Sequence, residues 1–288
     1  MLLFQRTISQ GLQRALRHWY LLLPLYLWNV LLGLLQTWPL FVIMSGGGLY
    51  NPFLGDLASG SADALVNLFL GSAVDAGTAA LWVFAVLPLT ALFGMAYNLF
   101  SGGILSVYAS AGPFWAGCRR MFWTFTALGG LLVLMAGLVV MSATFLARLL
   151  GGSAAFVLAF LALQCVGMLG EYARAIAVAR DRRNPFALLS MAVRFCIRWF
   201  GGALALALLG LLLHVALAAA YTSVAPMVMG LSSQSDGSPA IILLQQLALL
   251  AWLWIKLLRL AWAMSYVQAS GEARTSPGQA PSAPIVVS

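Results

Sequence analysis

Four charged side chains beside two apolar segments are the residues of this sequence whose types and spacing could do chemistry. Glu171 ends the uncharged stretch from Leu149 to Gly170, and Arg174 follows one helical turn later, close enough to pair at i,i+3. Lys256 and Arg259 hold the corresponding place near the end of the chain. In a bundle that brings the two segments together, Glu171 would meet Lys256. This pattern has two interpretations: an ion-pair cluster that fixes helix register, or a carboxylate that couples protons or ions near the inner mouth of a transport path.

Further candidates for functional residues are the polar side chains of His214, Asn98 and Gln164. His214 is expected to face the helix bundle and form a hydrogen bond with a neighbour, with a functional role as the alternative. Asn98 and Gln164 are expected to form hydrogen bonds between helices, each contributing on the order of 1 kcal/mol. In a transporter, the same side chains would instead line a polar cavity that water can reach.

The sequence lacks the motifs of the common enzyme classes. It contains no His-Glu-x-x-His, no Gly-x-Ser-x-Gly and no phosphate-binding loop. The three cysteines have no metal-ligand spacing, and the two histidines fall at opposite ends of apolar segments. We therefore predict no catalytic residue, no metal site and no cofactor, and a protein that is not an enzyme.

The composition indicates that the solvent of this chain is lipid. Of its 288 residues, 62% are hydrophobic and 8% are charged, whereas soluble domains have about 25% charged residues. A net charge of +8 would suggest nucleic acid as a partner of a soluble protein. Here the charges lie between apolar runs, so membrane orientation explains them better, and nucleic acid is not an expected partner.

The apolar runs predict an all-α, polytopic membrane protein with six transmembrane helices in one domain, residues 1–270. A membrane-crossing helix needs about 20 apolar residues, and the runs that fit are 19–44, 80–100, 122–146, 153–170, 199–221 and 240–260. Residues 271–288 are rich in Pro, Ser and Ala and are predicted to be a disordered tail.

The distribution of positive charge predicts the orientation of the chain. With six spans, all 15 lysines and arginines except Arg148 fall on one side, and the outer loops hold acidic residues instead. The positive-inside rule then places both termini in the cytoplasm of a bacterium, with the chain in its inner membrane. Orientation alone accounts for the arginine clusters, but these arginines could also bind anionic phospholipid or a membrane-protein partner. The predicted lipid contacts are Arg14, Arg17, Arg119, Arg120, Arg180, Arg182, Arg183, Arg194 and Arg198.

The chain also shows a threefold internal pattern. Each odd-numbered span follows a basic amphipathic segment with aromatic residues, as in LQRALRHWYLLLPLYLW, AGCRRMFWTFTALGGLL and MAVRFCIRWFGGALALA. Such segments are suited to lie in the headgroup layer as amphipathic cytoplasmic interfacial helices. The even-numbered spans end in helix-compatible stretches that match loosely, namely NLFSGGILSVYAS, GEYARAIAVARDR and KLLRLAWAMSYVQ. The pattern predicts three copies of one unit: an interfacial helix, a span out and a span back.

The stretches LRHWYLLLPLYLWNVLLGLL, YNLFSGGILSVYA and EYARAIAVARDRRNPFALLSMAVRFCIRWFGG carry a resemblance. Over residues 1 to about 268, the chain resembles bacterial inner-membrane proteins with about six spans and basic amphipathic connectors. This group includes the membrane domain fused to some glycerophosphodiester phosphodiesterases. The resemblance implies a polytopic membrane fold, and no phosphodiesterase residue is carried over by it.

Two functions fit these observations. The first is a non-enzymatic scaffold or partner component in envelope or lipid handling, which predicts a packed, dry bundle with an exposed interface. The second is a small-molecule or ion transporter with a site among the spans near Glu171, which predicts a polar cavity.

Overall fold

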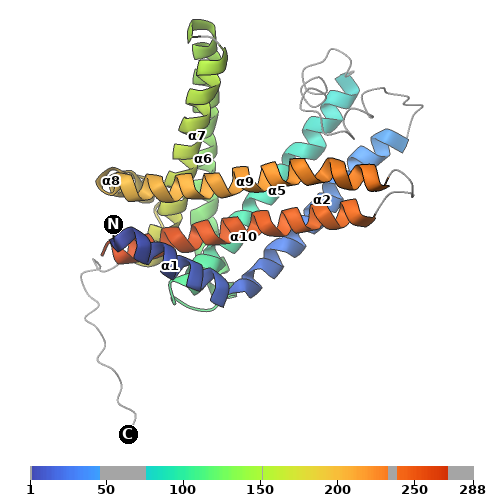
Figure 1. Ribbon diagram of the computed structural model, residues 1–288. Helices are drawn as coiled ribbons and strands as arrows, with labels where there is room; N and C mark the ends of the chain where they lie inside the picture. The colour runs from blue at the N-terminus through green and yellow to red at the C-terminus, as the bar shows by residue number, and fades with distance from the viewer. Residues whose placement is uncertain (1, 46–75, 151, 233–238, 272–288) are drawn as a thin grey trace. The chain divides into compact units, whose positions relative to one another are not determined.

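The computed structural model describes residues 2–45, 76–150, 152–232 and 239–271. Within these ranges the chain forms eight α-helices and no strand (Figure 1). The all-α prediction is therefore confirmed. The predicted disordered tail lies, apart from Gly271, outside the described residues. Two compact units share the chain, residues 1–26 with 97–288 and residues 27–96. The candidate site lies in the first of them.

Most of the helices are long enough to cross a bilayer. Their bounds are α1 Leu2–Arg17, α2 Leu22–Ser45, α5 Ala76–Tyr108, α6 Phe114–Leu150, α7 Gly152–Arg180, α8 Pro185–Arg198, α9 Phe200–Ser232 and α10 Pro239–Ala269. Among the described residues, five helices are long and apolar enough to cross a membrane. The number is up to six if the bent pair Phe4–Arg17 and Trp19–Leu35, whose halves meet at 69°, counts as one span. These helices fit a multi-pass membrane protein.

Helix α7 continues well beyond Gly170, where its span was predicted to end. It runs to Arg180, and its apolar window covers Val157–Arg180. It then stops in a left-handed turn, with Asp181 at φ 47° and the Arg182 amide donating to the Ala177 carbonyl. The carboxylate of Glu171 and the guanidinium of Arg174 therefore project from the interior of a helix rather than from its end.

The amphipathic segments differ from the prediction in one of the three cases. Helices α1 and α8 are separate helices, and the chain breaks after each at a non-helical residue, His18 or Trp199. The segment that begins at Phe114 shows no such break and continues directly into the span as one helix, α6. The prediction of a distinct second interfacial helix is therefore wrong, because no residue there interrupts the helical backbone.

Much of the buried part of the larger unit is formed by the C-terminal halves of α5, α7 and α10, which we call the junction. Its fully buried side chains include Ser101, Ile104, Leu105, Ala173, Ala175, Ile176, Ala177, Leu257, Ala261, Met264 and Ser265. Many of these side chains are small, which lets the helices approach closely without lipid between them. From the junction, the α6–α7 and α9–α10 hairpins leave in different directions (Figure 1).

The amphipathic segments pack around the junction in a regular order. Helix α1 packs along α10, where a Cβ atom on Gly11 would overlap Trp262. The start of α6 packs on the end of α5, where a Cβ atom on Gly102 would lie 3.1 Å from the Gly117 carbonyl oxygen. Helix α8 packs on α7. Each amphipathic segment thus contacts the returning helix of the preceding pair of spans, and the first contacts the last.

The halves of the hairpins away from the junction expose large apolar side chains. On α6 these include Val133, Leu134, Leu138 and Met141, and on α9 they include Leu208, Leu212 and Val215. Water would make such a surface aggregate, whereas lipid solvates it.

Candidate functional site

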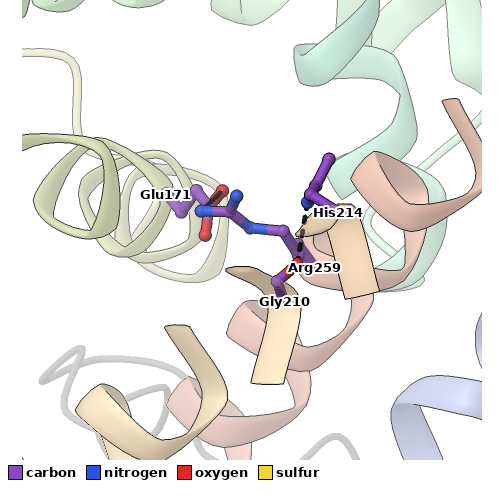
Figure 2. Close-up of polar contacts among 4 residues, drawn as sticks. All are labelled: Glu171, Gly210, His214 and Arg259. Carbon is purple, nitrogen blue, oxygen red and sulfur yellow. Dashed lines mark hydrogen bonds and ion pairs between the residues drawn. The ribbon is translucent and has the colours of Figure 1, made fainter. Parts of the chain in front are cut away.

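An ion pair joins α7 to α10 at the edge of the junction. Arg259 Nη2 lies 2.7 Å from Glu171 Oε1, and the two side chains are 17% and 18% exposed (Figure 2). The bundle thus brings the two charged segments together, but the direct partner of Glu171 is Arg259 rather than Lys256. The charges of Arg174 and Lys256 also act on the Glu171 carboxylate.

Arg174 is buried in the junction and binds neutral groups. Its Nη2 atom donates a hydrogen bond of 2.9 Å to Asn98 Oδ1, which links α7 to α5. The guanidinium carbon lies 5.5 Å from the centre of the Tyr97 ring, within the range of a cation–π contact. The side chain is 8% exposed. Its Nε atom is buried and has no hydrogen-bond partner among the described residues.

Lys256 reaches the same aromatic ring from α10. Its Nζ atom lies 3.4 Å from the centre of the Trp252 ring and 4.9 Å from the centre of the Tyr97 ring. The faces of these rings are electron-rich and stabilise the ammonium group in an environment with little water. The Tyr97 ring therefore contacts two cations that come from different helices.

His214 lies on α9, beside the cluster of charged residues formed by Glu171, Arg174, Lys256 and Arg259. Its Nδ1 atom donates a 2.7 Å hydrogen bond to the Gly210 carbonyl in the preceding turn of the same helix (Figure 2). Its ring meets the Trp252 ring edge-on, with centres 6.5 Å apart. Gly210 is needed at this point because a Cβ atom there would lie 2.8 Å from Arg259 Cδ. The glycine thus leaves room for the Arg259 stem to cross α9 on its way to Glu171.

The cavity next to the ion pair is small. It lies between α7, α9 and α10 and has a volume of about 10 Å³, about enough for one water molecule. Its lining residues are Met168, Glu171, Tyr172, Leu206, Ala207, Arg259, Trp262 and Ala263. No organic substrate fits in this space in the conformation described.

The remaining sequence candidate, Gln164, lies two turns before Glu171 on α7 and is partly exposed. It takes no part in the contacts described above. In the described ranges, no three His, Cys, Asp or Glu side chains come together as metal ligands do. What the cluster can do is hold charge: it concentrates three cations and one carboxylate in an apolar setting.

The predicted lipid-contact arginines are distributed around the amphipathic segments. Arg17, Arg119, Arg182, Arg183, Arg194 and Arg198 are exposed, and Arg14, Arg120 and Arg180 are partly buried. Several of them have defined neighbours. Arg180 Nη1 donates a hydrogen bond of 3.5 Å to Met191 Sδ. Arg120 Nε lies 3.9 Å from Asp181 Oδ1, and the Arg198 guanidinium lies 5.8 Å from the centre of the Trp199 ring.

Sequence reasoning missed the aromatic residues of the cluster, whereas it identifies Gly210 as a glycine that permits close helix approach. Tyr97 and Trp252 contact the cations, and Gly210 gives Arg259 its path. A signal for Trp252 was present, because it precedes Lys256 by one helical turn and must share its face. No such signal existed for Tyr97, because its neighbours come from other helices.

In comparisons with protein-family models, curated proteins and solved structures, no significant match to this chain was found.

Proposed function

We propose that this chain is a multi-pass protein of the bacterial inner membrane that acts as a non-enzymatic scaffold or partner component in envelope or lipid handling. The observation that carries the proposal is the packed junction. Its three helices are joined by small buried side chains, and the adjacent cavity has room for about one water. Exposed arginines around the junction would contact anionic lipid headgroups.

The proposed role is tested by deleting the gene in its host and measuring phospholipid composition and envelope integrity. We expect the deletion to change at least one of them, and a plasmid copy to restore it. A matched plasmid copy that carries Arg182→Gln and Arg183→Gln should restore it less well, because it lacks two exposed lipid-contact charges. A deletion strain with normal lipids and a normal envelope that has lost uptake of a solute would contradict the scaffold proposal.

The proposed orientation places both termini and the arginine-rich connectors in the cytoplasm. It is supported by the position of the exposed arginines at the junction end of the helices and by the acidic outer loops of the sequence. The variant Arg182→Cys should react at position 182 with a membrane-impermeant maleimide only after the inner membrane is opened. Labelling of Arg182→Cys in intact spheroplasts would show that the topology is the reverse of the one proposed.

The three-copy interpretation forms part of this proposal. It is supported by the regular packing of α1 on α10, of the start of α6 on α5 and of α8 on α7. Such a closed order is what three equivalent units around a common axis would produce.

The transporter alternative has one observation in its favour. The Glu171–Arg259 pair lines the cavity between α7, α9 and α10, and a carboxylate in an apolar helix is a common proton-coupling group. Proteoliposomes with an internal pH dye test it, since Glu171→Gln should abolish any proton flux that the protein supports. Equal flux through wild type and Glu171→Gln would remove the coupling role.

A further inference from the structure

The cluster at the junction carries more positive than negative charge. Only two of the described residues are acidic, Glu171 and Asp181. Asp181 lies at the exposed end of α7 and faces Arg120. Glu171 is thus the one carboxylate that the described part of the chain supplies to Arg174, Lys256 and Arg259. Three cations and one carboxylate leave an excess of two positive charges.

The burial of Arg174 makes this excess costly. The side chain is 8% exposed, its Nη2 atom binds a neutral amide oxygen, and its Nε atom has no partner in the described ranges. A buried charge that has no counter-charge of its own is costly, because its lost hydration is not fully replaced. The cation–π contact with Tyr97 recovers only part of this cost.

We propose that this cluster binds a phosphate group, with Arg174 and Lys256 as its two ligands. A phosphate carries one or two negative charges and so matches the excess. The planar donors of a guanidinium bind two phosphate oxygens at once, and an ammonium adds a point charge. Both ligands contact the Tyr97 ring, so they come from α7 and α10 to the same place.

The depth of the cluster predicts that phosphate bound there is less sensitive to salt than phosphate bound at the surface. Arg174 lies six residues before Arg180 on the same helix, a distance of about 9 Å along the axis. The cluster is therefore deeper in the apolar layer than the partly buried Arg180 and the exposed Arg182 and Arg183 that follow α7. Salt screens exposed charges strongly and buried ones much less, so binding at the cluster should resist salt that removes surface-bound lipid.

Two sources could supply the phosphate: the headgroup of an anionic phospholipid and free inorganic phosphate. The full chain, purified in a mild detergent, is incubated with phosphatidylglycerol or phosphatidylcholine at low and high salt, and retained lipid is counted by native mass spectrometry. We expect one phosphatidylglycerol per chain to remain at high salt, at least tenfold more often than phosphatidylcholine. If inorganic phosphate raises the melting temperature and no lipid is retained, free phosphate is the ligand.

Matched variants separate this cluster from the surface. Lys256→Gln should reduce retention at high salt at least fivefold, whereas Lys256→Arg should preserve it because it keeps the charge. Arg6→Gln is the control, because it removes an equal charge from an exposed site outside the predicted lipid contacts and should leave retention at high salt unchanged. Equal loss in Lys256→Gln and Arg6→Gln would overturn the proposal.

The wild-type protein alone also provides a decisive measurement. If it binds neither phosphatidylglycerol nor inorganic phosphate at high salt, the cluster is not a phosphate site, whatever the variants do. Where a lipid headgroup supplies the phosphate, the proposal rests on the proposed inner-membrane location. A reversed topology in the maleimide experiment would overturn the proposed orientation while leaving binding by the purified protein measurable.

Discussion

Replacing Glu171 with Gln isolates the electrostatics of the junction, because the side chain keeps its shape and loses its charge. In the wild type, Glu171 pairs with Arg259 at 2.7 Å, and both side chains are mostly buried. Removing one member of a buried pair costs about 3–5 kcal/mol, because the other charge is left without a partner. Glu171→Gln also leaves Arg174, Lys256 and Arg259 together without a carboxylate from the described residues, so we expect the upper part of that range.

Replacing the other member of the pair, Arg259, should destabilise the protein less. Arg259→Gln removes one cation and leaves Glu171 under the influence of Arg174 and Lys256, which already act on its charge. We expect Arg259→Gln to cost about 1.5–3 kcal/mol, the contribution of a charged hydrogen bond. The double variant should cost less than the sum of the two single variants, because neither charge is then left unpaired.

The assay is the free energy of unfolding in bicelles, measured by steric trapping for the wild type, the two single variants and the double variant. Replacement of the exposed Arg183 by Gln is a matched control and should change the free energy by less than about 0.5 kcal/mol. The reasoning fails if Arg259→Gln destabilises the protein as much as Glu171→Gln, or if Glu171→Gln has the effect of the control.

Three further predictions concern the packing around the junction. Gly11→Leu should destabilise the protein by about 1–3 kcal/mol, because the new side chain would overlap Trp262. Gly201→Leu is the control and should cost clearly less, because the space around Gly201 is open. Equal melting temperatures of the two variants would contradict the α1–α10 contact. Asn184→Ala should cost about 1 kcal/mol, because the Asn184 side chain caps the start of α8, and thermal unfolding in detergent measures the loss. Burial raises the pKa of the Cys196 thiol to about 12, so the thiol stays protonated at pH 8 to 9. It should therefore resist iodoacetamide until the protein is denatured, as measured by peptide mass spectrometry. Rapid labelling of the native protein would contradict the burial of this thiol.

The sequence was sufficient to predict the helical class, because that class follows from local patterns. The meeting of the two charged segments was only a condition of the ion-pair interpretation. Apolar runs of bilayer length define helices, and charges such as Glu171 and Lys256 mark the ends of two of these runs. The direct partner of Glu171 was not predictable in this way. Lys256 and Arg259 lie one turn apart on α10, and only the packing of α9, with Gly210 opposite the Arg259 stem, determines which of the two reaches Glu171.

Local sequence patterns also could not predict that α6 is one unbroken helix. The three basic amphipathic segments look alike in sequence, yet the chain breaks after two of them and continues as a helix through the third. None of the three boundaries has a proline, so the difference arises from the packing of each segment on a different neighbour. The extension of α7 to Arg180 has a similar origin, because the residues after Gly170 are buried against α8 and α10.

The contact between α1 and α10 has a consequence for how the protein is made. The ribosome synthesises α1 before α10, and the surface on which α1 packs is completed only when α10 has emerged. During translation the apolar face of α1 therefore has no native partner and must be held by lipid headgroups or an insertion factor. A chain that stalls before α10 leaves this face uncovered, which would give the cell's proteases a means of recognising an unfinished copy.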